Sequence, residues 1–126
     1  MMNYSGNNTL FKSFACAVKG IIWVAGSQRN MKIHLVAAAA VLAAAIRFEI
    51  NCLEAALVFL AMALVMVAEM VNTAVEKAVD LVSPEYHPLA GRAKDAAAGA
   101  VLLAAFFSVV IGVLVFLPYI KKWLHD

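Results

Sequence analysis

The chain has 126 residues, of which 65% are hydrophobic and only 14% are charged. A soluble domain is about 45–50% apolar and about 25% charged, so this composition excludes an ordinary soluble domain, a disordered chain and a disulfide scaffold. The formal net charge of +2 implies no large basic surface for nucleic acid. We therefore predict an integral membrane protein with a single domain over residues 1–126 and with Cys16 and Cys52 unpaired.

The first expected element covers about residues 7–26 and has one apolar and one basic face. Lys12 and Lys19 lie seven residues apart, away from the apolar face. Apolar side chains recur at helical spacing on that face: Phe11, Phe14, Ala15, Val18, Ile22 and Ala25. The pattern lacks the compact apolar core and cleavage site of a signal peptide. It predicts an amphipathic helix that lies on the membrane surface.

Three further segments are expected to cross the bilayer, at about residues 31–48, 53–82 and 89–118. The first is alanine-rich and sits at the lower end of the spanning range of about 17–25 residues. The second ends before Ser83–Pro84, because proline disfavours a helical residue before it. The third is uncharged over residues 96–120, and Pro118 and Lys121–Lys122 are expected to mark its end. The predicted fold class is all-α, with three transmembrane helices and one N-terminal surface helix.

Basic residues are distributed unequally between the two sides of these spans. With three spans, the following seven share the side of the N-terminus: Lys12, Lys19, Arg29, Lys32, Lys77, Arg92 and Lys94. The opposite side holds three, namely Arg47, Lys121 and Lys122. Since cytoplasmic loops carry the excess of lysine and arginine, we expect a multi-pass protein of the cell membrane with a cytoplasmic N-terminus.

A polar stripe follows the apolar part of the second span. Its members are Glu69, Asn72, Glu76 and Asp80, which share an arc of about 80° on one helix face. Glu69 lies about 24 Å along the helix from Leu53, near the cytoplasmic boundary of the apolar layer. A carboxylate at this depth can meet the hydroxyl of a lipid and act as a general base. The alternative for Glu76 and Asp80 is simple solvation as the helix leaves the membrane.

The loop after this span and the start of the next helix add polar groups. Lys94 can neutralise phosphate oxygens, and Asp95 can hold a metal ion or orient that lysine. Tyr86 and His87 could stack on a base, although each of these signals is weak alone. The sequence contains no glycine-rich nucleotide-binding motif. No partner is predicted for His34, which is expected to be an ordinary interfacial histidine.

The polar stripe and this loop together resemble the small prokaryotic diacylglycerol kinase family. The likeness covers about Lys12 to Pro118 and is most specific in three stretches: Glu69–Glu76, Val79–Asp80 and Glu85–Asp95. Further details resemble the Gram-positive branch, whose members phosphorylate undecaprenol: Arg29–Asn30, Ile33–His34 and Ser83–Pro88.

This resemblance implies a membrane homotrimer with active sites shared between subunits, which transfers the γ-phosphate of ATP to a lipid hydroxyl. By analogy, Glu69 would be the catalytic base and Asn72 would help to place the acceptor. Glu76 would bind Mg²⁺, and the nucleotide would be held by Glu76, Glu85, Tyr86, His87, Lys94 and Asp95. The family has a second metal-binding glutamate where this chain has Gln28, so Gln28 is at most a weak metal ligand.

Three alternatives to an undecaprenol kinase remain open from the sequence. Diacylglycerol is the second candidate acceptor within the same class of enzyme. A small proton-translocating or transport subunit would use Glu69 as its exchanging carboxylate. A membrane-embedded assembly factor is the third alternative. The carboxylates out to Asp80 and the Lys94–Asp95 pair favour the kinase, because a proton site needs neither.

Overall fold

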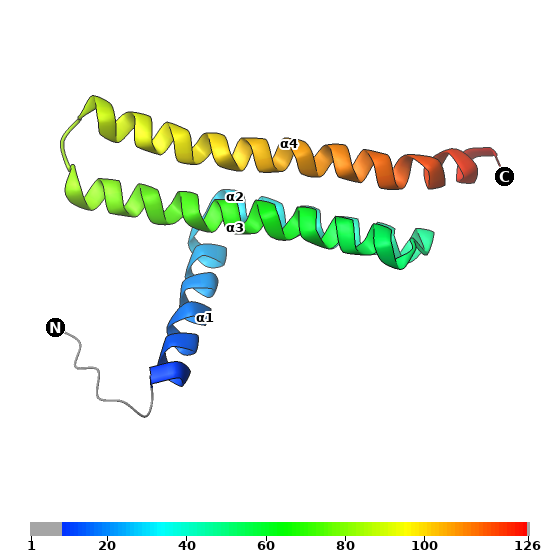
Figure 1. Ribbon diagram of the computed structural model, residues 1–126, viewed down its shortest axis with the longest axis horizontal. Coiled ribbons are helices and arrows are strands. Elements are labelled where there is room, and N and C mark those ends of the chain that lie inside the picture. The colour runs from blue at the N-terminus through cyan, green and yellow to red at the C-terminus, as the bar shows by residue number, and fades with distance from the viewer. Residues whose placement is uncertain (1–8, 126) are drawn as a thin grey trace.

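The computed structural model describes residues 9–125, which form four helices joined by short connections. These are α1 (Thr9–Ser27), α2 (Arg29–Phe48), α3 (Cys52–Val82) and α4 (Pro88–His125). In Figure 1, α3 and α4 form a long hairpin, α2 runs beside α3, and α1 turns away from them at a steep angle. The described part of the chain is all-α, as the sequence predicts, and all four helices are long and apolar enough to cross a membrane.

The last helix runs past Pro118 and Lys121–Lys122, the residues expected to mark the end of the third span. α4 continues through Pro118 to His125. Proline removes one backbone hydrogen bond from a helix, but the turns on either side keep theirs. The turn that holds Pro118 is also fixed from outside, because the Tyr119 hydroxyl donates to Glu54 Oε2 at 2.5 Å and the Phe48 ring packs on Phe116 and Tyr119. These tertiary contacts keep the chain helical beyond the proline.

The other helix ends follow from local chemistry. α2 stops at Glu49, which adopts a left-handed backbone with φ 51°, while the amides of Glu49 and Ile50 return to the carbonyls of Ile46 and Ala45. α3 starts with a reciprocal capping box. Asn51 Oδ1 accepts from the Glu54 amide at 3.0 Å, and Glu54 Oε2 accepts from the Asn51 amide at 3.0 Å.

The core of the molecule is the contact between α3 and α4, and it is built from small and β-branched side chains. The buried residues of this contact are Val58, Ala61, Val65, Val101, Ala104 and Val115. Small side chains let two helices approach closely, which favours association in lipid. The approach is close enough for Ser108 Oγ of α4 to donate to the Ala61 carbonyl of α3 at 3.0 Å.

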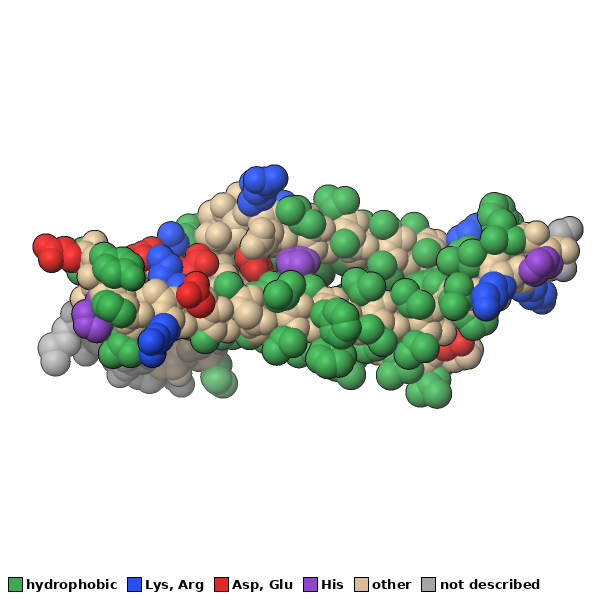
Figure 2. Space-filling view, turned by 90° about the horizontal axis from the view of Figure 1, so that it is seen from above, with side chains coloured by type: hydrophobic (Ala, Val, Ile, Leu, Met, Phe, Trp, Pro, Cys, Tyr) green, Lys and Arg blue, Asp and Glu red, His purple; other side chains and the backbone are tan. Residues whose placement is uncertain are grey.

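The outer surface matches a lipid environment over most of its length. Figure 2 shows charged side chains gathered towards the two ends of the long helices, with hydrophobic side chains along the stretch between them. Large apolar side chains such as Leu60, Leu103 and Phe106 are more than half exposed. A surface with so many exposed large apolar side chains would be unfavourable in water but suits contact with acyl chains. Cys16 and Cys52 are free, as predicted.

We predict that the capping box sets part of the stability of α3. Asn51→Ala removes the side-chain oxygen that accepts from the Glu54 amide, so the free energy of unfolding in mixed micelles should fall by about 1 kcal/mol. Asn51→Ser keeps a capping oxygen and should stay close to the parent. Equal destabilisation by both substitutions would show that Asn51 acts through something other than its cap.

Candidate functional site

The polar stripe of α3 is buried in a graded manner. Glu69 is 2% exposed and Asn72 is 6% exposed, whereas Glu76 is half-buried and Asp80 is exposed. Thr73 is also buried, and its Oγ1 donates to the Glu69 carbonyl at 2.9 Å. This gradient is in burial against the neighbouring helices, and the position of each residue in the bilayer stays a prediction. The stripe therefore places carboxylates at successive positions, from the buried middle of α3 to its exposed end.

A cavity of about 320 Å³ lies beside the inner part of the stripe, where α2, α3 and α4 meet. α2 contributes Asn30, Ile33 and His34 to its walls. The α3 side consists of Glu69, Asn72 and Glu76, and the α4 side is Ala98, Val101, Leu102 and Ala105. Three helices thus bring two carboxylates, two amides and an imidazole around one space. We call this space the polar cavity.

Within residues 9–125, two residues that line the polar cavity each have a buried side-chain oxygen atom without a hydrogen-bond partner. These are Glu69 Oε2 and Asn72 Oδ1. The amide of Asn72 is turned outward by a bond from Nδ2 to Glu76 Oε1 at 3.2 Å, which leaves its oxygen for another group. Buried polar atoms are normally paired, so an unpaired acceptor in a cavity indicates a place for a donor or a cation. A hydroxyl group from a substrate would satisfy Glu69 Oε2.

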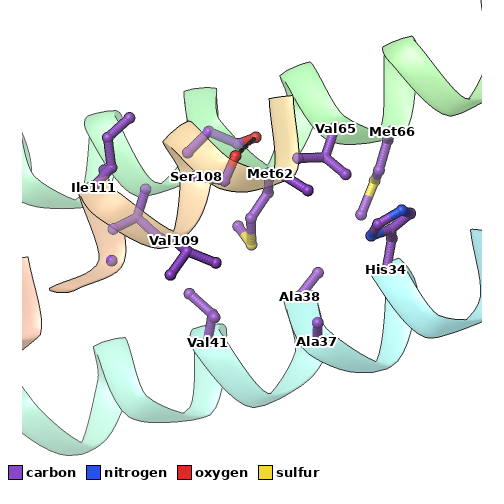
Figure 3. A pocket seen from close by; sticks show the side chains of 14 residues that line it. His34, Ala37, Ala38, Val41, Met62, Val65, Met66, Ser108, Val109 and Ile111 are labelled. Carbon is purple, nitrogen blue, oxygen red and sulfur yellow. Dashed lines mark hydrogen bonds between the residues drawn. The ribbon is translucent and has the colours of Figure 1, made fainter. Parts of the chain in front are cut away.

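A second cavity, of about 230 Å³, continues along the helices towards the middle of the apolar layer. Its walls are alanine, valine and methionine side chains of α2 and α3, with Ser108, Val109 and Ile111 from α4 (Figure 3). Ser108 uses its hydroxyl on the Ala61 carbonyl, so the walls are nearly all apolar. We call it the apolar cavity. His34 and Ala105 line both cavities, so the two spaces are neighbours on either side of these residues.

His34 is the site residue that the sequence reasoning missed. It is half-buried and lies between the polar cavity and the apolar cavity. The sequence carried a signal, because Asn30 and His34 are four residues apart and therefore share one face of a helix. Nothing in the sequence shows which helix that face contacts. The packing of α2 on α3 decides this.

The outer polar residues lie at the α3–α4 turn. Lys94 Nζ of α4 contacts Asp80 Oδ1 of α3 at 2.9 Å. Tyr86 is 92% exposed, and Glu85, His87 and Asp95 are also exposed. Within the turn, Ser83 Oγ donates to the Glu85 carbonyl and His87 Nδ1 accepts from the Leu89 amide. The structure thus places these predicted nucleotide residues at one end of the hairpin, with Lys94 over the end of the polar stripe.

The two predicted metal ligands, Glu76 and Gln28, do not line the same cavity. Gln28 caps the start of α2 from an extended backbone, and its Nε2 donates to Ser27 Oγ at 3.4 Å. It is not among the residues that line the polar cavity. Between residues 9 and 125, no three His, Cys, Asp or Glu side chains gather as a metal-binding group. Mg²⁺ in phosphate-transfer sites uses one or two carboxylates together with substrate phosphates, and half-buried Glu76 fits that role.

Comparison with known proteins identifies the family. Residues 15–116 match the family described as prokaryotic diacylglycerol kinase. The chain belongs to this family. It is therefore a lipid kinase, and it is a membrane protein, as its apolar helices indicate.

Named relatives cover most of the chain. It is 45% identical over 111 residues to the undecaprenol kinase of Bacillus subtilis, which spans 88% of this chain and 90% of that protein. It is 44% identical over 110 residues to a diacylglycerol kinase of Synechocystis, covering 86% of this chain and 63% of the relative. The diacylglycerol kinase of Escherichia coli is 31% identical over 110 residues, which cover 86% of this chain and 88% of that protein.

We predict that Glu69→Gln abolishes phosphate transfer without unfolding the protein. Glutamine has nearly the same shape but cannot accept a proton, and loss of a general base lowers a rate by about 10²–10⁴-fold. The measurement is labelled-phosphate transfer from ATP to lipid in micelles, with thermal unfolding as the control for folding. A transfer rate within tenfold of the parent would remove Glu69 as the base.

Proposed function

We propose that this lipid kinase transfers the γ-phosphate of ATP to the hydroxyl of undecaprenol at the cytoplasmic face of the membrane. The observation that carries the proposal is the buried Glu69 side chain, which lines the polar cavity and whose Oε2 has no partner among residues 9–125. The polar cavity shares two lining residues with the apolar cavity. A hydroxyl on a hydrocarbon chain is the chemical group that such a pair of cavities can hold. The likeness to an undecaprenol kinase over 88% of the chain supports the choice of acceptor.

In this proposal the residues of the polar cavity act on the acceptor. The lipid hydroxyl donates a hydrogen bond to Glu69, which takes the proton as the oxygen attacks the γ-phosphorus of ATP. The bond from that phosphorus to the bridging oxygen breaks, and ADP leaves. Asn72 helps to place the acceptor, because its side chain is already oriented by Glu76 at 3.2 Å. The α4 wall of the polar cavity is apolar, and together with the bound lipid chain it would keep water, which competes with the lipid hydroxyl for the phosphate, away from the reacting groups.

The outer residues hold the nucleotide. Lys94 balances the charge of the phosphates, and Glu85, Tyr86, His87 and Asp95 bind the rest of ATP at the exposed turn. Glu76 is about two turns outward from Glu69 and would hold Mg²⁺, which neutralises phosphate charge when bound. Gln28 would add a carbonyl oxygen but no charge. Catalysis then depends mainly on the positioning of the two substrates, as in other phosphoryl transfers.

The proposed membrane arrangement has α1 on the cytoplasmic surface and three spans in α2, α3 and α4. The steep turn between α1 and the other helices supports a surface position for α1 (Figure 1). The excess of basic residues on the N-terminal side supports a cytoplasmic N-terminus. We further propose a homotrimer in which neighbouring subunits complete each other's active sites. The wide exposure of the nucleotide residues supports this, since a second subunit could cover them.

Diacylglycerol is the second candidate acceptor. Relatives named as diacylglycerol kinases share 44% and 31% of aligned residues with this chain. The apolar cavity is bordered by alanine, valine and methionine side chains, which suit contact with a hydrocarbon chain of either kind. Membership in a kinase family argues against the alternatives of a transport subunit and an assembly factor.

We predict a preference for undecaprenol when both lipids are offered at equal mole fraction in the same micelles. The kcat/KM with undecaprenol should exceed that with diacylglycerol by about tenfold or more, a difference that one or two well-placed apolar contacts supply. Labelled-phosphate transfer to each lipid measures it, and Glu69→Gln serves as the background control. A preference for diacylglycerol would reverse the assignment of the acceptor.

We also predict that Glu76 sets the magnesium requirement. Glu76→Gln keeps an oxygen that can accept from Asn72 Nδ2 but removes the negative charge. The Mg²⁺ concentration for half-maximal activity should rise by about tenfold or more at fixed ATP and saturating lipid. Glu49→Gln, at an exposed position at the other end of the helices, is the matched control. An unchanged titration curve for Glu76→Gln would exclude it as a metal ligand.

A further inference from the structure

The contact between Asp80 and Lys94 is the one ion pair among residues 9–125. Asp80 lies in the last turns of α3 and Lys94 in the first turns of α4, on opposite sides of the turn at residues 83–87. The Asp80 side chain is 55% exposed and that of Lys94 is 41% exposed, so water screens the pair. Exposed ion pairs contribute little to folding stability. Stabilisation of the hairpin is therefore a weak explanation for this contact.

The contact does restrict where the lysine ammonium can lie. A lysine on the surface of a helix has a long flexible stem and many accessible positions. Here Lys94 Nζ is held 2.9 Å from Asp80 Oδ1, over the helix face that carries Glu76 and Glu69 further inward. An ammonium has three N–H donors, and the contact with Asp80 Oδ1 occupies one of them. The other two remain available for phosphate oxygens.

We propose that Asp80 is a positioning residue that holds the Lys94 ammonium at the outer end of the polar stripe, ready to bind the phosphates of the nucleotide. This inference rests on the proposed nucleotide role of Lys94. Asp80 itself need not touch the substrate. Its carboxylate reduces the number of positions open to Lys94 before ATP arrives, so less freedom is lost on binding.

A competing role for the same contact predicts the opposite effect. If Asp80 competed with phosphate for Lys94, removing its charge would free the lysine and lower the KM for ATP. If Asp80 orients Lys94, removing the charge leaves the ammonium mobile and raises the KM for ATP. The sign of the change in KM therefore separates the two roles.

The experiment is a steady-state titration of ATP at saturating lipid with Asp80→Asn in the full-length protein. We expect the KM for ATP to rise by about five- to tenfold, the range that one well-oriented charged hydrogen bond provides. The KM for lipid and the thermal unfolding midpoint should stay at the parent values. Asp80→Glu, which retains the charge, should recover most of the affinity, and Glu49→Gln should behave as the parent.

Lys94→Gln separates this inference from the proposed function on which it rests. If Lys94→Gln leaves the KM for ATP unchanged, Lys94 does not bind the nucleotide and both proposals fail at this residue. If Lys94→Gln raises the KM but Asp80→Asn leaves it unchanged or lowers it, only the positioning role of Asp80 is overturned. A parallel loss of thermal stability and of lipid affinity in Asp80→Asn would indicate a structural role and would also overturn it.

Discussion

The close contact of α3 with α4 is the interaction on which the rest of this structure depends. Lipid offers no hydrogen bonds to the protein and no hydrophobic driving force between helices, so close packing of small side chains must hold them together. Polar side chains link the two helices at three levels. Lys94 contacts Asp80 at one end, Ser108 bonds to the Ala61 carbonyl in the middle, and Tyr119 bonds to Glu54 at the far end.

The hairpin also explains why the site lies where it does. α3 presents its polar stripe along the seam with α4, so the inner members of the stripe are buried by α4 and by the neighbouring α2. Glu69 ends up 2% exposed, with one oxygen unpaired. A buried carboxylate is unfavourable unless it has a partner, so the fold maintains a site that a hydroxyl group would stabilise. His34 of α2 lines both the polar cavity and the apolar cavity.

The division between the two cavities parallels the two parts of an amphipathic substrate. A lipid alcohol has a hydroxyl that needs polar partners and a chain that needs none. The polar cavity offers carboxylate and amide oxygens, whereas the apolar cavity offers mainly methyl groups and methionine side chains. Under the proposed function, the phosphates would bind at the end of the hairpin where Lys94 and Asp80 are exposed to water. One helical hairpin thus connects groups that need very different surroundings.

The sequence by itself determined the class of fold and the position of the polar stripe, because hydrophobic runs and helical spacing are local properties of a chain. The residues at 69, 72, 76 and 80 were predicted to share one face, and in the structure Glu69 and Asn72 are buried, Glu76 is half-buried and Asp80 is exposed. The resemblance of the same stretch to a known family predicted that the protein is a lipid kinase. The roles of individual residues, the trimer and the orientation in the membrane remain predictions.

Tertiary structure alone decided which of these faces meet. His34 joined the site because α2 packs its Asn30–His34 face towards α3, and no local pattern encodes that choice. Helix α4 continues beyond Pro118 because Tyr119 bonds to Glu54, a residue 65 positions away in the chain. The contact of Lys94 with Asp80 likewise spans a turn whose geometry the sequence does not specify. Each of these features depends on contacts between distant segments, which only the packed helices create.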